Sequence, residues 1–172
     1  MQADLAESLS TRSTLARIGP YEVTDDPHRV DVPAVHAFLA HDSYWRKGVT
    51  LERVARSVRM SLPISVHLTT ATPRMVGFGR VVTDTVTHAW IDDLFVLREH
   101  RRRGMAGAMI SAALAHPAVA DASLQLLLTA DAHALYARHG FRQFPDAVAL
   151  MARTTEPSGG ELPPPVAPLT SD

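Results

Sequence analysis

The spacing of apolar residues in the first third of the chain predicts one short strand followed by two amphipathic helices. The strand is expected at residues 18–24. Asp31 followed by Val-Pro-Ala is typical of a helix start, with Asp31 as the N-cap and the proline in the first turn, and this helix should run to about residue 40. A second helix is expected from Thr50, because the apolar residues at positions 51, 54, 55 and 58 share one face, and Pro63 should end it.

Three strand-like runs come next, and they predict an antiparallel meander. The runs cover residues 64–70, 75–84 and 87–97, and a proline-containing turn at residues 72–74 separates the first two. Gly77 and Gly79 lie inside the second run, where they indicate a bulge or a close approach of another backbone. Residues 105–115 are rich in Ala, Met, Ile and Leu, which predicts a helix packed on the sheet.

The last third of the chain adds one strand and one helix to this pattern. Residues 124–129, with the sequence LQLLLT, form a continuous apolar run that is typical of a buried strand. A helix is expected from about residue 131 to residue 139, where Gly140 should stop it, and residues 148–152 are a candidate last strand. This order of elements predicts an α/β fold of the mixed α+β kind, with a central mixed, mainly antiparallel sheet and helices on its faces.

The composition narrows the class of protein. The chain has 172 residues, 46% of them hydrophobic, which is enough for one domain with its own core. Its 17 Lys and Arg against 18 Asp and Glu give no global positive field, so neither nucleic acid nor a membrane is expected as a partner. The absence of Cys excludes disulfides, thiolate nucleophiles and zinc–thiolate sites, and the nine His show no metal-ligand spacing, so no metal is expected.

Two further features concern the location of the protein and the division of the chain. No apolar run is long enough to span a membrane and residues 1–17 lack a signal-peptide core, so a cytoplasmic location is expected. The excess of Arg over Lys and the many Ala are typical of a bacterial protein. Five of the 12 prolines fall between Pro157 and Pro168. We therefore expect an N-terminal extension at residues 1–17, one folded domain at 18–153 and a disordered, proline-rich tail at 154–172.

The segment RRRGMA at residues 101–106 is expected to connect a strand to a helix, and this setting favours anion binding. The free backbone N–H groups at a helix start attract phosphate. Gly104 and Ala106 let the backbone approach an anion closely, and the arginines add charged hydrogen-bond donors. A solvated basic turn and a local nucleic-acid patch are alternatives for the same residues.

Two motifs in this region carry a resemblance to a known family. The stretch VLREHRRRGMAGAMI from Val96 resembles motif A of the GNAT superfamily of acyl-CoA-dependent N-acyltransferases, whose pattern Gln/Arg-x-x-Gly-x-Gly/Ala is met by Arg101, Gly104 and Ala106. Residues 132–141 (AHALYARHGF) are similar to the later signature of the family, in which a helix carries a Tyr and ends in Gly-Phe. The resemblance covers residues 18–153 and implies the GNAT fold, in which the sheet is splayed in the middle and has helices on both faces.

The resemblance also implies acetyl-CoA as the cosubstrate. In this family the pantetheine arm pairs with the exposed backbone between the splayed strands, and the pyrophosphate lies on the motif A loop. The implied cofactor-binding residues are Val96, Arg98, Arg101, Arg102, Arg103, Gly104, Met105, Ala106, Thr129 and Tyr136. Thr129 stands where the family often has Asn.

Tyr136 falls on the position that the family uses to hydrogen-bond the departing sulfur of CoA and, in many members, to protonate it. A phenol with a pKa of about 10 is a competent donor to the thiolate of a thiol whose pKa is about 8.5. The resemblance therefore implies that Tyr136 is a catalytic residue, and a core aromatic on an amphipathic helix is the alternative.

Asp92 and Asp93 interrupt an otherwise apolar strand, and alternation is expected to send their side chains to opposite faces. The surrounding stretch, WIDDLFVL, looks like the corresponding part of polyamine acetyltransferases, which carry Glu-Asp before the same apolar triplet. That similarity implies that Asp92 is the catalytic base, acting through an ordered water, and that Asp93 contacts the substrate. The alternative is that both acids cap a bulge or pair with Arg side chains.

Tyr44 and Trp45 lie in the predicted loop between the first two helices, which in this family borders the acceptor pocket. Their rings are candidates for stacking on a substrate or covering a cation, and a hydrophobic plug is the alternative.

These observations predict an acetyl-CoA-dependent N-acetyltransferase that transfers the acetyl group directly to an amine in a ternary complex. The backbone N–H of Val96 should polarise the thioester carbonyl. The acceptor is expected to be a small-molecule amine or a protein amine, and the enzyme a monomer or homodimer. Two other functions stay open, namely a non-catalytic acyl-CoA-binding or sensor module with a GNAT fold, and an Arg-driven nucleic-acid-binding protein.

Overall fold

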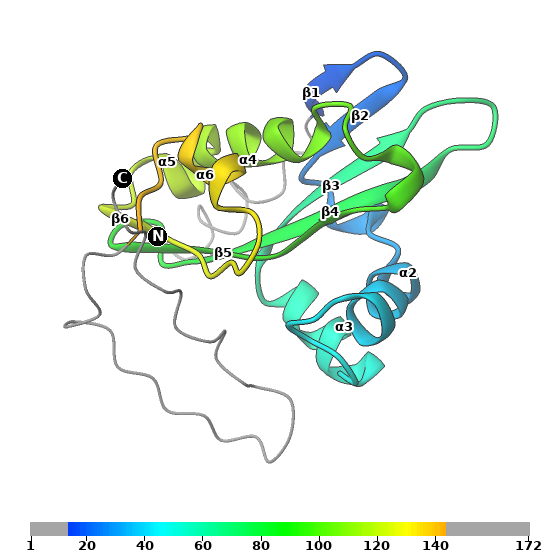
Figure 1. Ribbon diagram of the computed structural model, residues 1–172, viewed down its shortest axis with the longest axis horizontal. Helices are drawn as coiled ribbons and strands as arrows, with labels where there is room; N and C mark the ends of the chain where they lie inside the picture. Colours follow the sequence, from blue (N-terminus) through cyan, green and yellow to red (C-terminus); the bar gives the residue numbers. More distant parts are fainter. Residues whose placement is uncertain (1–13, 144–172) are drawn as a thin grey trace, which may run out of the picture.

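The computed structural model describes residues 14–143 of the chain, and these residues form a six-stranded sheet with helices on both faces (Figure 1). In chain order the elements are β1 (Thr14–Ile18), β2 (Tyr21–Thr24), η1 (Pro27–Arg29), α2 (Val32–Ala37), η2 (Phe38–Asp42), α3 (Leu51–Arg59), β3 (Leu62–Leu68), β4 (Arg74–Thr83), β5 (His88–Val96), η3 (Arg98–His100), α4 (Met105–Ala115), α5 (Pro117–Ala120), β6 (Leu124–Leu126) and α6 (His133–Ala137).

The strands of the sheet follow the order of the chain, β1-β2-β3-β4-β5-β6. Neighbouring strands are antiparallel from β1 to β5, and β5 pairs with β6 in parallel. This arrangement confirms the predicted mixed, mainly antiparallel sheet. The long crossover through α4 and α5 supplies the connection that a parallel pair requires.

The sheet is open at the end of the parallel pair. The β5–β6 ladder reaches from His88↔Leu124 only to Trp90↔Leu126, whereas β5 continues to Val96. The second half of β5 therefore pairs with β4 on one side and has no ladder with β6 on the other. This opening is the predicted splay, and we call it the β5–β6 opening.

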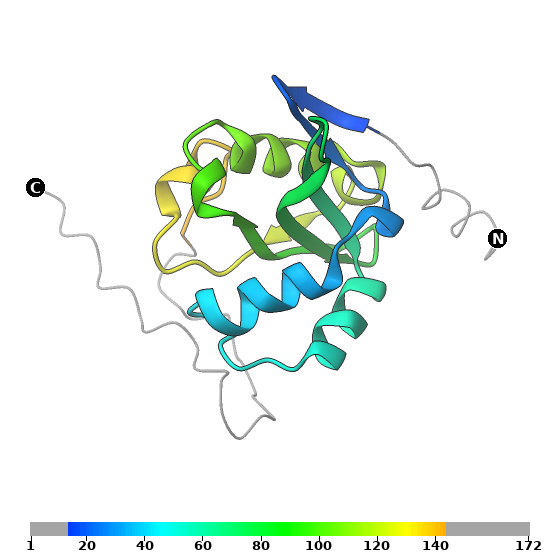
Figure 2. The ribbon, with the colours of Figure 1, turned by 90° about the vertical axis from the view of Figure 1, so that its right-hand side faces the viewer.

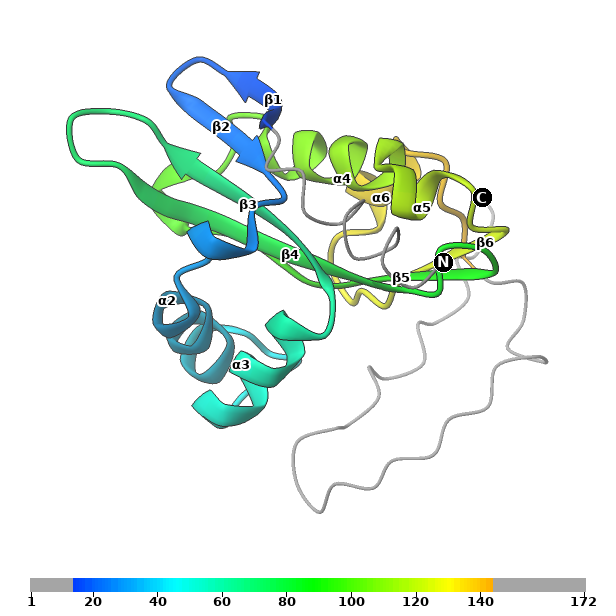
Figure 3. The same ribbon diagram turned by 180° about the vertical axis from the view of Figure 1, so that it is seen from behind.

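The helices form two layers, one on each face of the sheet. The helices α4, α5 and α6 lie on one face, and α2 and α3 lie on the other (Figures 1, 2 and 3). We call these the α4 face and the α2/α3 face. Each has its own core: Met105, Met109 and Ala113 of α4 pack on the strands of one face, and Val35, Phe38 and Val54 pack with Phe78 and Phe95 on the other.

The predicted helix starts are confirmed, because the caps are encoded locally. The Asp31 side chain accepts a hydrogen bond from the Ala34 backbone N–H at 3.0 Å, and Thr50 accepts one from the Arg53 N–H at 3.4 Å. The helix α3 ends at Arg59, before Pro63, and Pro63 lies near the start of β3, where a missing N–H is tolerated. The prediction that Pro63 ends this helix is therefore wrong.

The N-terminal strand differs from the prediction. Residues 18–24 are part of a hairpin, because Gly19, with a φ of +53°, turns the chain between β1 and β2. The strand β1 begins at Thr14, inside the segment predicted as an N-terminal extension. The long-range pairing of β1 with β2 has no signal in the local pattern, which explains the difference.

The C-terminal elements are shorter than predicted. The buried strand expected at residues 124–129 is wrong, because β6 has three residues, Leu124 is 39% exposed and Leu128 is 49% exposed. The helix α6 spans five residues and its last turn ends at Gly140, which has a φ of +86°, as expected of a helix stop. The predicted strand at residues 148–152 and the predicted tail at 154–172 lie outside the described residues. Within residues 14–143 no helix is long and apolar enough to cross a membrane.

Candidate active site

The N-terminus of α4 forms a backbone cradle of the kind that binds anions. Gly104 precedes the helix with a φ of +82°, which favours glycine, and the first bond within the helix runs from the Ala108 N–H to the Gly104 carbonyl at 3.0 Å. The N–H groups of Met105, Ala106 and Gly107 come before that bond and have no partner within the helix. They are therefore free to bind an anionic group, and the helix dipole favours it there.

A cavity of about 260 Å³ lies in front of this cradle. It is walled by the end of β5, by the loop that leads into α4 and by α6 with the turn after it. The lining residues are Val96, His100, Arg101, Arg102, Gly104, Met105, Ala106, Gly107, Leu135 and Arg138. The cavity thus brings together the two segments in which the sequence motifs were found.

The predicted basic residues take different positions at this cavity. Arg101 lines it and donates a hydrogen bond from Nε to the Val96 carbonyl at 2.8 Å, which ties the loop to β5. Arg102 also lines the cavity, whereas Arg98 and Arg103 are exposed and lie outside its lining. Arg138 lines it from the α6 side, and sequence reasoning missed this residue although it stands two positions after Tyr136.

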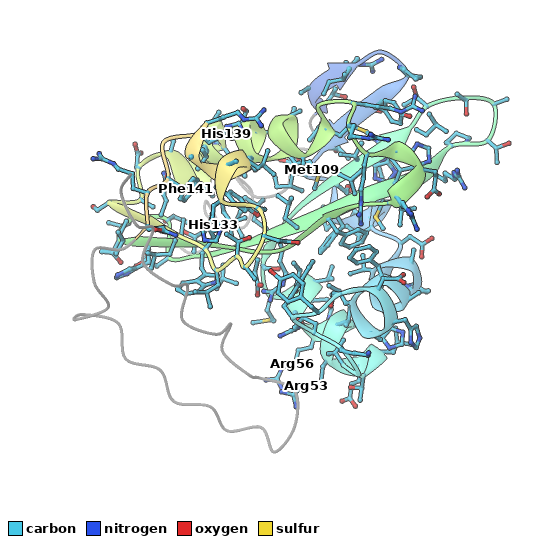
Figure 4. The ribbon with its side chains drawn as sticks, in the orientation of Figure 1. Arg53, Arg56, Met109, His133, His139 and Phe141 are labelled. Carbon is cyan, nitrogen blue, oxygen red and sulfur yellow. The ribbon has the colours of Figure 1, made fainter. Side chains whose placement is uncertain are left out.

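The turn after α6 lies beside the first turn of α4. A Cβ at Gly107 would lie 3.6 Å from Nε2 of His139, an ordinary van der Waals distance (Figure 4). The turn after α6 therefore neighbours the helix that forms the cradle.

His100 is a second residue that the sequence did not reveal. It is buried, with Nδ1 3.0 Å from the Tyr21 hydroxyl and Nε2 3.2 Å from Nη2 of Arg74. Because a guanidinium only donates, Nε2 must accept, and a neutral imidazole then donates from Nδ1 to the tyrosine oxygen. These contacts join β2 and β4 to the loop at the cavity. The residues lie far apart in the sequence, so no local motif indicates the contacts.

The backbone of Val96 faces the β5–β6 opening. The next residue, Leu97, donates its N–H to the Val76 carbonyl of β4 at 2.9 Å. Since successive N–H groups of a strand point to opposite sides, the Val96 N–H points away from β4. It therefore points into the part of the sheet where β6 is missing.

Tyr136 is buried on α6, with its ring edge-on to Phe141 at a centroid distance of 5.9 Å. Burial, together with the neighbouring Tyr44, Asp131 and Asp92, raises the pKa of its hydroxyl to about 12. Among residues 14–143 the hydroxyl has no hydrogen-bond partner. Tyr136 thus presents a neutral O–H that is free to donate, and its ring packs as a core aromatic does.

The strand β5 carries a bulge at the acid pair. Phe78 pairs with Phe95 and Arg80 pairs with Asp92, so β5 has one residue more than β4 over this interval, and Asp93 has a φ of +53°. Opposite the bulge, a Cβ at Gly79 would lie 3.4 Å from the Leu94 Cα, and one at Gly77 would lie 3.0 Å from the Phe95 carbonyl oxygen. The bulge and close approach predicted from the two glycines are confirmed.

The bulge corrects the prediction that the two carboxylates face opposite sides of the sheet. The extra residue interrupts the alternation of side chains along β5 at Asp93. Asp93 therefore points to the same face as Asp92, which is the α2/α3 face. Arg80 donates from Nε to Asp93 Oδ2 at 2.6 Å and from Nη2 to Asp92. The alternative of a bulge with Arg pairing is what the structure shows. Arg80 could have been noticed in the sequence as the only charged residue inside an apolar run.

The two acids nevertheless differ in what they can reach. Asp93 is buried, and besides Arg80 it accepts from Nε1 of Trp45 at 3.2 Å, with Nε of Arg46 at 3.8 Å. The Asp92 side chain is 31% exposed. Burial and the charge of Asp93 raise the pKa of Asp92, and Arg80 opposes them. Asp92 is therefore the accessible carboxylate, with an increased affinity for a proton.

The aromatic pair in the loop after η2 has divided roles. Trp45 packs on Phe38, with 6.3 Å between the ring centroids, and its Nε1 donates a hydrogen bond to Asp93. Trp45 therefore fits the alternative of a hydrophobic plug. Tyr44 is 53% exposed, and its hydroxyl accepts from the Ala130 N–H at 2.9 Å. This bond connects the loop to the segment before α6, where Thr129 accepts from the Ala132 N–H at 3.0 Å. Of these two residues, Tyr44 is the one whose ring is exposed to a substrate.

Among residues 14–143 no group of His, Asp and Glu could hold a metal ion. The chemistry that these residues offer is acid–base and hydrogen-bonding chemistry. An anion cradle lies on the α4 face, and an accessible carboxylate, Asp92, lies on the α2/α3 face. The phenol of Tyr136 lies on α6, outside the cavity lining and near enough to Asp92 for that charge to raise its pKa.

Comparisons with known proteins agree with this geometry. The family model of the acetyltransferase (GNAT) domain matches residues 66–143. A presumed GNAT-family acetyltransferase from Xanthomonas campestris pv. campestris shares 35% identity, with a TM-score of 0.76 over 84% of this chain and 97% of that protein. Among curated proteins no relative matches the sequence.

More distant structures share the fold. A presumed acetyltransferase from Deinococcus radiodurans R1 has 19% identity and a TM-score of 0.61 over 82% of this chain and 93% of its own. Glucosamine-6-phosphate N-acetyltransferase from Arabidopsis thaliana has 11% identity and a TM-score of 0.57 over 79% of this chain and 99% of its own.

Proposed function

Because the chain belongs to the GNAT family of acetyltransferases, we propose that it transfers the acetyl group of acetyl-CoA directly to an amine acceptor in a ternary complex. The observation that carries this proposal is the placement of groups around the β5–β6 opening. The anion cradle and the Val96 backbone lie toward the α4 face, and Asp92 lies on the α2/α3 face. Two ligands that approach from the two faces would meet at the opening.

The residues of the α4 face fit acetyl-CoA, which supplies an activated thioester when bound. The N–H groups at the start of α4 suit a pyrophosphate, with Arg102 and Arg138 on either side of the cavity. The Val96 N–H, which points into the opening, would pair with the pantetheine arm and donate to the thioester carbonyl, where negative charge develops. Arg101 fixes the Val96 carbonyl at 2.8 Å and so holds this part of β5 in place.

Asp92 would remove the proton from the acceptor amine. An alkyl ammonium has a pKa of about 10.4, so its deprotonation at pH 7 costs about 4.6 kcal/mol. The raised pKa of Asp92 makes it a better proton acceptor than an ordinary aspartate, directly or through one water. Its partial exposure on the α2/α3 face lets an amine reach it.

Tyr136 would donate a hydrogen bond to the departing sulfur. With a pKa of about 12, the hydroxyl stays neutral at physiological pH. Full proton transfer to the thiolate of a thiol with a pKa of about 8.5 would cost about 5 kcal/mol. The structure therefore favours stabilisation of the thiolate by a hydrogen bond over complete protonation. In the overall step the C–N bond forms, the C–S bond breaks, the amine loses a proton to Asp92, and the thiolate takes a proton from solvent.

The test is a screen of the purified protein with acetyl-CoA and a panel of primary amines, in which free thiol is measured. We expect amine-dependent release of thiol. Binding of acetyl-CoA without turnover on any amine would contradict the proposal and support an acyl-CoA-binding module. Nucleic-acid binding with a steep salt dependence, which acetyl-CoA does not displace, would support the nucleic-acid alternative.

A further inference from the structure

One part of the α2/α3 face is not used by the site described above. The helices α2 and α3 cover this face only at the end of the sheet that holds β2 and the start of β4 (Figures 1 and 3). Beyond them, Val82 pairs with Trp90, and Trp90 pairs with Leu126, so three apolar side chains form a row across β4, β5 and β6. Val82 is 45% exposed.

The direction of this row follows from the residues next to it. Ala89 and Ile91 belong to the core of the α4 face, so Trp90 between them points to the α2/α3 face. In β6, Gln125 pairs with Ala89 and Leu126 pairs with Trp90, so Leu126 shares the face of Trp90. Leu128, just beyond β6, extends the row with a side chain that is about half exposed.

The row leads to Asp92 and to Tyr44. Asp92 lies two residues after Trp90 on the same strand and the same face, a separation of about 6.6 Å. Tyr44 reaches the segment that follows Leu128, because its hydroxyl is bonded to the Ala130 N–H. We call the five residues Val82, Trp90, Leu126, Leu128 and Tyr44 the apolar strip. It ends at the carboxylate that would receive the proton of the acceptor.

We propose that the apolar strip is the acceptor subsite and that the acceptor is a primary amine joined by a short alkyl chain to a flat apolar body such as an aromatic ring. This inference rests on the proposed function. The ammonium group complements the accessible charge of Asp92, and a body about 6.6 Å away lies over Trp90. Arg53 and Arg56 of α3 lie well below the sheet in the view of Figure 4.

The test compares phenethylamine with ethylamine, which have the same amine but differ in the apolar body. In the wild-type protein, kcat/KM for phenethylamine should exceed that for ethylamine by about 100-fold. Val82→Ser and Leu128→Ser should each lower kcat/KM for phenethylamine by about tenfold and leave that for ethylamine within twofold. Both side chains are about half exposed and lie outside the buried cores, so the variants should fold.

Met60→Ser is the matched control, because Met60 is 76% exposed at the end of α3 and does not belong to the strip. It should leave both substrates unchanged. Equal kcat/KM for the two amines, or no effect of the strip variants, would overturn the inference. So would a dimer in sedimentation experiments that Val82→Ser and Leu128→Ser dissociate, because a second copy would then cover the strip.

A binding experiment separates this inference from the proposed function. Calorimetry with phenethylamine in the presence of CoA reports the subsite without acetyl transfer. Binding that both strip variants weaken, without turnover, would support the subsite and contradict the enzyme. Turnover of ethylamine or an amino acid, with no binding of phenethylamine, would support the enzyme and contradict the subsite.

Discussion

The two faces of the sheet contribute to the candidate site in different ways. On the α4 face the binding groups are backbone N–H groups within one segment, Met105 to Gly107, placed by the turn at Gly104. On the α2/α3 face the groups are side chains from separate elements: Arg80 of β4, Asp92 and Asp93 of β5, and Trp45 of a loop. The first arrangement depends on one backbone conformation, and the second depends on a network in which each member holds the others.

The cores of the two faces show the same contrast. Beside the α4-face core the buried polar side chains include the histidines His100 and His116, whereas the α2/α3 face buries Ser65, His67, Arg80 and Asp93. Buried polar groups require partners, so this face is more sensitive to single substitutions and to pH. The predictions below use that difference.

The largest effect is expected from Gly104→Val. A Cβ at this position meets no protein atom within 4 Å, but the residue has a φ of +82° and the side chain would enter the space of the anion. Acetyl-CoA binding should become undetectable by calorimetry, a loss of more than about 1000-fold. Gly19→Val is the control, since Gly19 also has a positive φ and an open Cβ position but lies in the β1–β2 turn. Unchanged binding in Gly104→Val would show that the cradle is not the pyrophosphate site.

Asp92→Asn should lower kcat/KM by a factor of about 100–1000 at neutral pH, as expected for the loss of a general base. The pKa of Asp92 is raised, so the wild-type enzyme should lose activity, as pH falls, at a higher pH than an ordinary aspartate would allow. The variant should lack this acidic limb in its pH profile. An acidic limb that persists in Asp92→Asn would assign the proton transfer to another group.

Tyr136→Phe should lower kcat by about 10–100-fold and change the dissociation constant of acetyl-CoA only a few fold. The variant keeps the ring and its packing on Phe141 but loses one hydrogen bond to a developing thiolate. Steady-state rates measured together with calorimetry distinguish the roles. Loss of affinity would indicate a cofactor anchor, and an unchanged kcat and affinity would indicate a core aromatic.

The smallest effect concerns the stability of the α2/α3 face. His67 is buried, with Nε2 3.0 Å from the Ser65 hydroxyl, and burial, helped by Arg29, lowers its pKa to about 4 from the ordinary 6.5. Since the unfolded chain binds the proton first as pH falls, His67 should reduce stability between pH 6.5 and about 4. Thermal unfolding of His67→Gln should show a weaker fall of Tm over this range. An identical fall in both proteins would refute the assignment to His67.

The extent to which the sequence predicts this structure also differs between the two faces. Motif A is contiguous, so the strand, the loop and the start of α4 could all be placed from local signals such as Gly104. The acid pair was found, but the direction of Asp93 depends on the register of β5 against β4, which the bulge sets. Arg80 was overlooked because its role appears only when it lies opposite the two acids.

Contacts between distant parts of the chain explain the other differences. The hairpin of β1 with β2 and the His100 contacts to Tyr21 and Arg74 join residues that no local pattern connects. The apolar run at residues 124–129 has the composition of a buried strand, but the exposure of its side chains depends on the open end of the β5–β6 ladder. Local capping and turn chemistry were predictable, and strand register was not.

The central claim is that the acetyl group passes directly between ligands held on the two faces of the sheet. It is tested by a single-turnover experiment with acetyl-CoA labelled in the acetyl group, quenched with and without a primary amine and analysed by intact-protein mass spectrometry. The account predicts that without amine the chain gains no acetyl group and releases no thiol, and that with amine one thiol appears per amide formed. An acetylated chain that forms before the amine is added and then passes its label to the amine would contradict it.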